Sequence, residues 1–409
     1  MPLRTPPKLD PALALRESSS PALEWKKHEC ELITPLYGGG VTAGEVDPDM
    51  PVRASAIRGQ LRYWWRLLAR HKWKFGTTDQ IRAREFELWG GLGTPPQASK
   101  VWVRISNLGT PDIKPWAKYG RNDKDGWKTL PDPEDWADAA YALFPGQGKK
   151  PGTAESKEPA SLVKHGLKLH IELACDTKCS AEQRDQVFEA LRWWASFGGL
   201  GARTRRGLGA IGITGLELVS AEEARAAGCR LVLAGYPTNS ISAWKAAVRK
   251  LRDFRQGVAE GRNRGSAPGR PGRSRWPEPD AIRRLTRRHA GLHAPEHVAG
   301  NVFPRAAFGL PLIFHFKDTG DPGDFSLQPA GRDRMASPLI LRPYGQGNQW
   351  RAAALLLPHA HLQTMELTLP NGQVTDPGQW WNPAVAGAVP PLTGRGTDAL
   401  TAFLAYFVK

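Results

Sequence analysis

The chain has 409 residues, with 56 lysines and arginines against 40 aspartates and glutamates, a formal net charge of +16 and an isoelectric point near 9.9. This length predicts two or three domains, and the basic balance favours a polyanionic partner such as nucleic acid. No stretch of eighteen apolar residues occurs, so neither a membrane span nor a membrane partner is expected. Four cysteines are too few for a disulfide framework, which favours the cytoplasm.

Residues 1–27 are rich in proline and serine, which predicts a loosely ordered extension without a signal peptide. A strand-like run then leads to a glycine loop, Gly38, Gly39 and Gly40, whose backbone a ligand can approach. An acidic segment follows. Its carboxylates suit acid–base or metal chemistry, but the interspersed prolines favour a solvated turn. The segment contains Glu45, Asp47 and Asp49.

Residues 51–70, PVRASAIRGQLRYWWRLLAR, predict a helix from Ala56 to Arg70 with Ser55 as its cap. Its apolar stripe contains Trp64, which is therefore expected in the core. Beside the stripe runs a row of arginines at a spacing of four, with no acid among them: Arg58, Arg62, Arg66 and Arg70. We interpret Arg53, Arg58 and Arg62 as contacts to RNA phosphates, and a solvated basic face is the alternative.

The next segments continue an alternating α and β pattern. Residues 100–106 and 166–174 alternate as half-buried strands, and 107–160 form a long insertion with one short helix near 134–143. Ser180 and Gln183 predict a capping box for the following helix. The order strand, helix, strand, strand, helix, strand over the first half is that of a ferredoxin-like unit, assigned to residues 28–220.

A glycine-rich loop, FGGLGARTRRGLGAI, follows this helix at residues 197–211. Glycines allow close approach of another chain, and guanidinium groups bind phosphates, so a polyanion-binding loop is predicted. A tight turn with solvated arginines is the alternative. The candidate RNA contacts here are Gly198, Gly199, Gly201, Arg203, Arg205, Arg206, Gly207 and Gly209.

The second half, residues 221–409, predicts apolar strands with two helices, the first capped by Ser242. Residues 249–288 hold thirteen lysines and arginines against four acids. Their centre, at 262–280, predicts a flexible basic arm that binds RNA or serves as a linker. Two metal-like patterns also occur. His289, His293 and His297 are spaced by four, but Gly291 and Pro295 argue against one helix that would align them. Cys175 and Cys179 form a CxxxC pair, but no second pair of cysteines matches it. Neither a metal nor another cofactor is therefore expected.

Four segments together carry a resemblance: ITPLYGGG, PVRASAIRGQLRYWWR, FGGLGARTRRGLGAI and RMASPLILRP. They resemble the RAMP superfamily of CRISPR proteins, and within it most closely the family of the first Cmr subunit of the type III-B effector complex. The resemblance implies an α+β chain of two tandem ferredoxin-like (RRM-like) βαββαβ domains with long insertions. It also implies a non-catalytic, antiviral RNA-binding subunit that contacts guide crRNA, target RNA and other RAMP subunits, near the 3′ end of the guide.

Two enzymatic hypotheses compete with RNA binding. A metal-independent endoribonuclease of the RAMP guide-processing kind would need a general-base histidine, for which the first half offers His28, His71, His165 and His170. None of them belongs to a motif with a nucleophile or a second base. A dinucleotide-binding enzyme would need a strand before its glycines and a helix after them, whereas here the glycine-rich loop follows a helix and precedes a strand.

Overall fold

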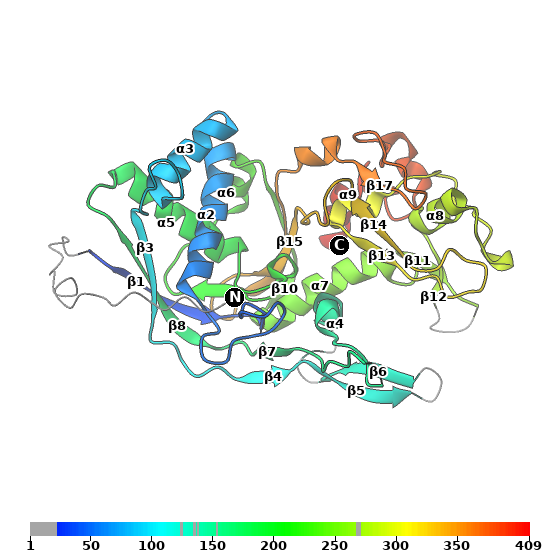
Figure 1. Cartoon of the computed structure of the whole chain (residues 1–409), viewed down its shortest axis with the longest axis horizontal. Coiled ribbons are helices and arrows are strands. Elements are labelled where there is room, and N and C mark those ends of the chain that lie inside the picture. Colours follow the sequence, from blue (N-terminus) through cyan, green and yellow to red (C-terminus); the bar gives the residue numbers. More distant parts are fainter. Residues whose placement is uncertain (1–22, 123–125, 134–135, 137–138, 153, 267–270) are drawn as a thin grey trace, which may run out of the picture.

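The computed structural model describes the chain except residues 1–22, 123–125, 134–135, 137–138, 153 and 267–270. It is an α+β protein with several small antiparallel sheets, which confirms the predicted class. The first and second halves lie side by side along the longest axis (Figure 1). In the part of the chain that the structure describes, no helix is long and apolar enough to cross a membrane.

The first half is built on a four-stranded antiparallel sheet with the order β3-β8-β1-β9. Two helices, α2 and α5, cover one face of this sheet (Figure 1). The strands and helices of this unit follow one another as β1-α2-β3-β8-α5-β9, with α3 added after α2, which is the predicted order. The bounds are β1 Lys26–Leu32, α2 Ala54–His71, α3 Thr78–Trp89, β3 Val101–Ser106, β8 Lys168–Cys175, α5 Ala181–Phe197 and β9 Ile211–Ile213.

Helix α2 carries the predicted apolar stripe into the core. Ile57, Leu61 and Leu68 are completely buried, and Trp64 is 1% exposed, so its assignment to the core is confirmed. The helix begins at Ala54, two residues earlier than predicted, with Arg53 at its N-cap and no side-chain hydrogen bond there. The expectation of a Ser55 cap is therefore wrong. The predicted capping box of α5 is present, since Ser180 Oγ accepts from the Gln183 N–H at 3.1 Å.

The insertion after β3 is folded rather than loose. One of its strands enters a three-stranded sheet, β2-β7-β4, and two more form a hairpin, β5-β6. Trp116 and Leu143 are buried in a cluster with Trp244 and Val248 of the second half, so the insertion packs against both halves. The bounds are β2 Leu36–Tyr37, β4 Ile113–Pro115, β5 Ala117–Asn122, β6 Gly126–Pro131, α4 Ala140–Leu143 and β7 Ser161–Val163.

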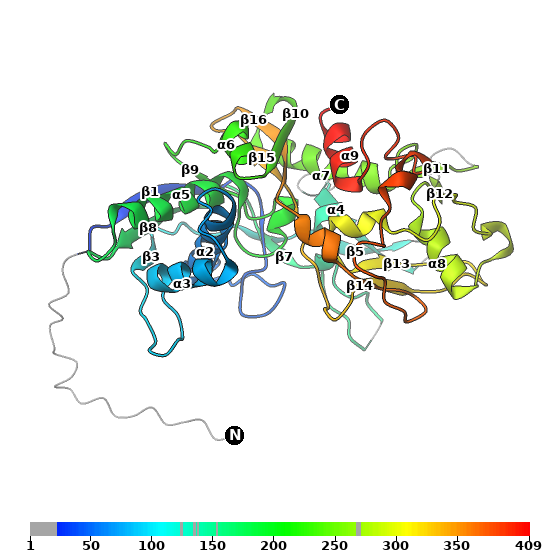
Figure 2. The same cartoon turned by 90° about the horizontal axis from the view of Figure 1, so that it is seen from above.

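The second half has a three-stranded sheet with the order β10-β16-β15. The chain runs β10-α7-β15-β16-α9, and among the described residues no fourth strand joins this sheet. Seen from above, α7 and α9 lie near each other (Figure 2). Phe254 of α7 and Phe403 of α9 are buried in the same core, together with Phe308. The bounds are β10 Arg230–Thr238, α7 Ser240–Gln256, β15 Leu339–Tyr344, β16 Trp350–Leu356 and α9 Ala399–Phe407.

Helix α7 starts before the predicted cap. Asn239 is the N-cap, and its side chain accepts a hydrogen bond from the Ser242 N–H at 2.8 Å, so Ser242 lies within the first turn. The remaining elements connect and cover the two sheets. They are α6 Ala221–Ala226, β11 Arg262–Arg264, β12 Pro271–Ser274, α8 Glu278–Thr286, β13 Leu312–Phe314, β14 Phe325–Pro329 and β17 Leu367–Thr368.

The basic arm expected at 262–280 is a folded hairpin over most of its length. Strands β11 and β12 pair in antiparallel fashion, Trp276 is buried, and α8 starts at Glu278. The expectation of a flexible arm is therefore wrong for the described residues, because a buried tryptophan anchors the segment where the sequence shows mostly glycine and arginine. Residues 267–270, within the same arm, lie outside the described part.

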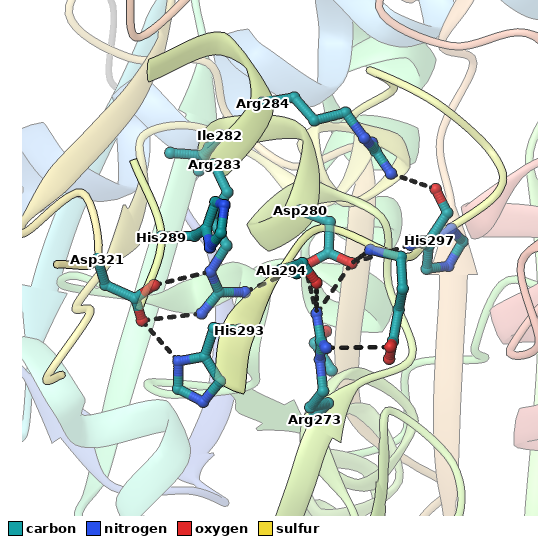
Figure 3. Close-up of polar contacts among 12 residues, drawn as sticks. Arg273, Asp280, Ile282, Arg283, Arg284, His289, His293, Ala294, His297 and Asp321 are labelled. Carbon is teal, nitrogen blue, oxygen red and sulfur yellow. Dashed lines mark hydrogen bonds and ion pairs between the residues drawn. The ribbon is translucent and has the colours of Figure 1, made fainter. Parts of the chain in front are cut away.

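The three spaced histidines do not align on one helix. His289 follows α8, and the segment to His297 wraps around the start of that helix (Figure 3). His293 Nδ1 lies 2.9 Å from Asp321 Oδ2 and 3.3 Å from Asp318, whereas His297 Nε2 lies 3.2 Å from the carbonyl of Arg275. Arg283 donates two hydrogen bonds to the Asp321 carboxylate, both of 3.0 Å. The guanidinium is thus the principal partner of this buried acid.

This ion pair predicts acid sensitivity of folding. The hydrogen bonds from Arg283 hold the pKa of Asp321 well below its usual range. A lowered pKa in the folded state stabilises the protein above the unfolded pKa of about 4, and this contribution is lost as the pH falls below it. We expect Asp321→Asn to lower the free energy of unfolding by about 2 kcal/mol at pH 7. In urea unfolding, the free energy of unfolding of this variant should be closer to that of wild type at pH 3 than at pH 7, by about 1 kcal/mol.

Asp333→Asn is the matched control for this experiment, because Asp333 is exposed. The free energy of unfolding of this control variant should equal that of wild type at both pH values. A deficit of Asp321→Asn that stays constant between pH 7 and pH 3 would contradict the lowered pKa.

Candidate nucleic-acid interface

The two glycine segments singled out in the sequence lie against each other. The Ala202 N–H donates to the Tyr37 carbonyl at 2.7 Å, which ties the second loop to the end of β2. A Cβ atom on Gly39 would lie 3.3 Å from Gly201 Cα, and one on Gly201 would lie 2.5 Å from the Tyr37 carbonyl oxygen. Both glycines have positive φ, 96° and 71°. Glycine is therefore required on both sides of this contact.

Arg53 joins these loops to the start of α2. Its Nη2 atom donates to the carbonyls of Gly39 and of Gly40, the latter at 3.2 Å. The first turn of α2 contains no acid, and its N-cap makes no side-chain hydrogen bond. The N–H groups of a first helical turn have no partner within the helix and carry partial positive charge. Arg53 thus joins the first glycine loop to the start of α2, where the first-turn N–H groups add partial positive charge.

The arginine row of α2 meets α3 along its length. Arg58 donates to the Trp89 carbonyl, and Arg70 donates to Thr78 Oγ1 at 2.9 Å. Between them, Arg62 and Arg66 both contact Glu85 Oε1, at 2.7 and 2.9 Å. The row itself contains no acid, and the acid comes instead from the neighbouring helix α3. This partner was not predicted from the sequence, although a glutamate on the buried side of TDQIRAREFELW, level with Ile81 and Leu88, could have indicated it.

A hollow of about 250 Å³ opens beside the start of α2. Gly59 lies in its wall, and nothing lies within 4 Å of the position of a Cβ atom there. Burial, followed by the charge of Arg62, lowers the pKa of Arg58 from its usual value. An anion entering the hollow would offset this lowering, because its charge stabilises the protonated guanidinium. The hollow is lined by Ala54, Ser55, Arg58, Gly59, Arg62 and Val103.

The three arginines of the glycine-rich loop have different surroundings. Arg203 has a φ of 62° and donates through Nε to the Ala142 carbonyl at 3.1 Å, so it faces the insertion. Arg205 donates to the Ser337 carbonyl and to Tyr63 Oη, the latter at 3.0 Å. Arg206 is buried and donates to the Phe308 carbonyl at 3.1 Å and weakly to that of Leu339 at 3.5 Å. The loop therefore points largely toward the second half.

Arg342 of β15 makes the reciprocal contacts. It is 3% exposed and donates to the Gly198 carbonyl at 3.0 Å and weakly to that of Ile211 at 3.4 Å. Burial lowers the pKa of Arg206 and of Arg342 to about 9, so both are charged at neutral pH. We call this pair of arginines and their carbonyl partners the joint between the halves.

Four glycines of the loop are buried rather than part of an open surface. A Cβ atom on Gly207 would lie 2.6 Å from the Trp244 ring, and one on Gly209 would lie 2.0 Å from the Leu200 carbonyl oxygen. The expectation that Arg206 and these glycines are accessible is corrected here. The second half covers Arg206 and Gly207, whereas the other three glycines pack mainly against the loop itself and the first-half helices. Buried at this position are Gly198, Gly199, Gly207 and Gly209. Gly201 is the exposed glycine of the loop.

The other candidate residues are spread over the first half. His28 lies on β1 against Phe188, with 6.1 Å between ring centroids, whereas His170 is paired with Glu29 on the neighbouring strand β8. His71 is in the last turn of α2, and His165 lies between β7 and β8. In the acidic segment, Asp47 Oδ1 accepts from the N–H groups of Asp49 and Met50 at 3.0 Å, which is a turn geometry. All four cysteines are free thiols.

Two solved structures are similar to this chain at low sequence identity. Among solved structures, the chain is similar to Cmr1 from Pyrococcus furiosus in its apo form, with 16% identity, 81% of this chain and 87% of that chain covered, and a TM-score of 0.41. It is also similar to a chain of the type III-B Cmr-beta complex bound to cognate target RNA, with 11% identity, 81% and 94% coverage and a TM-score of 0.41. No curated protein matches the chain.

One family model matches the sequence itself. It is the model of the RAMP superfamily, and the match runs over residues 29–211. This range begins in β1 and ends in β9, so it spans the whole first sheet, helix α2 and the glycine-rich loop. The resemblance drawn from the glycine segments and the arginine helix is thus confirmed over the first half. The match to the RAMP superfamily therefore covers residues 29–211 of this chain, from the first sheet through the glycine-rich loop.

Proposed function

We propose that the chain is a non-catalytic RNA-binding subunit of a type III-B CRISPR RNA-guided effector complex in the cytoplasm. In this role it holds the 3′ region of the guide crRNA and the paired target RNA, next to other RAMP subunits. The family match over the first half and the sequence segments shared with the first Cmr subunit support this assignment. The two halves would be tandem ferredoxin-like domains, the second of which lacks its last strand.

One observation carries the proposal: Arg53 links the open start of α2 to the paired glycine loops. RNA phosphates would lie over Gly38, Gly39, Gly40 and Gly201, and the guanidinium groups of Arg53, Arg58 and Arg62 would border the strand. Arg203 would extend this surface toward the insertion. Contacts of this kind give affinity without sequence preference, so sequence would be read by pairing between guide and target.

The test is binding of the purified chain to labelled single-stranded RNA over a salt series. On a single strand, each phosphate contact adds about 0.7 to the slope of log affinity against log salt concentration. We expect Arg58→Ala to weaken binding and to flatten this slope by about 0.7, the value for one contact on a single strand. Arg225→Ala is the control, because Arg225 is exposed on α6, outside this surface.

An Arg58→Ala slope equal to that of wild type would remove Arg58 from the interface. Equal losses in Arg58→Ala and Arg225→Ala would indicate that total charge, rather than this surface, determines binding.

A further inference from the structure

A cleft of about 420 Å³ lies where α2 and α3 meet the second half, beyond the surface assigned to the RNA backbone. Both halves contribute to it, since Leu357 and Pro358 follow β16 whereas the other lining residues belong to or border the two helices. Pockets for small ligands have volumes of about 300–1,000 Å³, so one nucleotide fits here. The cleft is lined by Tyr63, Arg66, Leu67, Arg70, His71, Thr78, Ile81, Arg82, Glu85, Leu357 and Pro358.

The charge of the cleft is positive. Three arginines line it, and Glu85, the acid among the lining residues, is shared between Arg66 and Arg62. Arg70 has a neutral side-chain partner, Thr78. Arg82 lies 3.3 Å from Asp79, but both side chains are largely exposed, at 73% and 89%, so this pair holds the arginine only weakly. Arg70 and Arg82 therefore have guanidinium donors to offer an anion.

The histidines near the cleft add little to this charge. Burial, followed by the charge of Arg70, lowers the pKa of His71. Burial, followed by His359 and Arg205, lowers the pKa of His361. Both imidazoles are therefore neutral at pH 7, and the arginines supply the positive charge.

The rest of the lining suits an aromatic base. Tyr63 is half-buried, and its hydroxyl is engaged by Arg205, whose guanidinium also lies 5.7 Å from the Tyr63 ring centroid. These contacts hold the ring in place. Leu67, Ile81 and Pro358 add apolar surface beside it. Bases stack on aromatic side chains in a manner that tolerates any sequence.

We propose that this cleft binds one nucleotide of an RNA strand, with the base against Tyr63 and the phosphate between Arg66, Arg70 and Arg82. The inference rests on the proposed RNA-binding function and extends it. The strand would run along α2 from the Arg58 hollow to the cleft, because both are lined by successive turns of that helix. Arg62, which lines the hollow, and Arg66, which lines the cleft, share Glu85 and so connect the two positions.

A mononucleotide photoprobe tests the cleft without RNA. The full-length chain is labelled with 8-azidoadenosine 5′-monophosphate, and the labelled residues are mapped by mass spectrometry. We expect label within residues 63–71 that AMP removes, whereas adenosine, which lacks the phosphate, competes at least tenfold less well. Arg70→Ala/Arg82→Ala should reduce this label on the order of tenfold. The control Arg225→Ala/Arg288→Ala removes the same charge at two exposed positions outside the cleft and should retain the label.

The outcomes separate this inference from the proposed function. Label outside the cleft, equal competition by adenosine, or equal loss in the control variant overturns the cleft assignment. RNA binding that persists without AMP-sensitive label overturns the cleft proposal alone. AMP-sensitive label in a chain that binds no RNA at any salt concentration overturns the assignment to RNA and makes a free nucleotide the ligand.

Discussion

Replacing Arg206 by alanine should lower the free energy of unfolding by about 3 kcal/mol. The guanidinium is buried and donates to the carbonyls of Phe308 and Leu339, so its removal leaves buried acceptors without a partner. It also leaves a cavity beside these carbonyls, where the guanidinium lay. Part of this loss is offset, because a buried charge no longer has to be desolvated. The measurement is urea unfolding followed by tryptophan fluorescence.

Two further variants separate the causes. Arg206→Met keeps most of the volume but has no donors, so the difference between Met and Ala reports the cavity, and the difference between Arg and Met reports the hydrogen bonds. Arg342→Met should resemble Arg206→Met, because Arg342 makes the reciprocal contacts to Gly198 and Ile211. If both methionine variants are as stable as wild type, the joint is held by apolar packing and our account of it is wrong.

The burial of Arg206 also limits which variants are informative in the RNA assay. A variant that replaces Arg203, Arg205 and Arg206 together would lose the joint as well as any phosphate contact. Its RNA binding would fall because the two halves separate, and the loss would not locate the RNA. Arg58 is a sharper choice, since its side chain contacts the end of α3 within the same half.

The sequence predicted those parts of the fold that depend on local periodicity. The apolar stripe of α2 and the alternation in β3 and β8 are local, because every residue of each pattern lies within a few turns or pleats of the next. The arginine row was likewise predicted correctly as a row. Its acid could have been found by the same reasoning, since Glu85 lies at a buried position of α3 between Ile81 and Leu88.

The burial of the loop arginines could not be predicted in this way. Arg206 donates to a carbonyl 102 residues later, and Arg342 to one 144 residues earlier. Backbone carbonyls are present at every position, so no residue type marks the ones that an arginine will reach. The composition of the loop does not predict the burial of its arginines either, because a loop of glycine and arginine can face solvent or a second domain.

Gly59→Glu should weaken RNA binding on the order of tenfold at 0.1 M salt. Gly59 is exposed in the second turn of α2, and a Cβ atom there meets nothing within 4 Å. A glutamate at this position places a carboxylate in the wall of the hollow, between Arg58 and Arg62. There it would repel a phosphate and attract the guanidinium groups that we assign to the RNA. The measurement is the same salt series as for wild type, and the deficit should shrink as salt screens the charge.

Gly59→Ala is the matched control. Alanine is favoured over glycine within a helix by about 1 kcal/mol, so this variant should be more stable than wild type and should bind RNA equally well. Gly59→Glu should also fold well, because glutamate is a good helix former and lies three residues before Arg62. A loss of binding in the glutamate variant therefore cannot come from unfolding. If both variants bind like wild type, the RNA does not pass over the start of α2, and the basic hairpin at β11 and β12 becomes the better place to look for it.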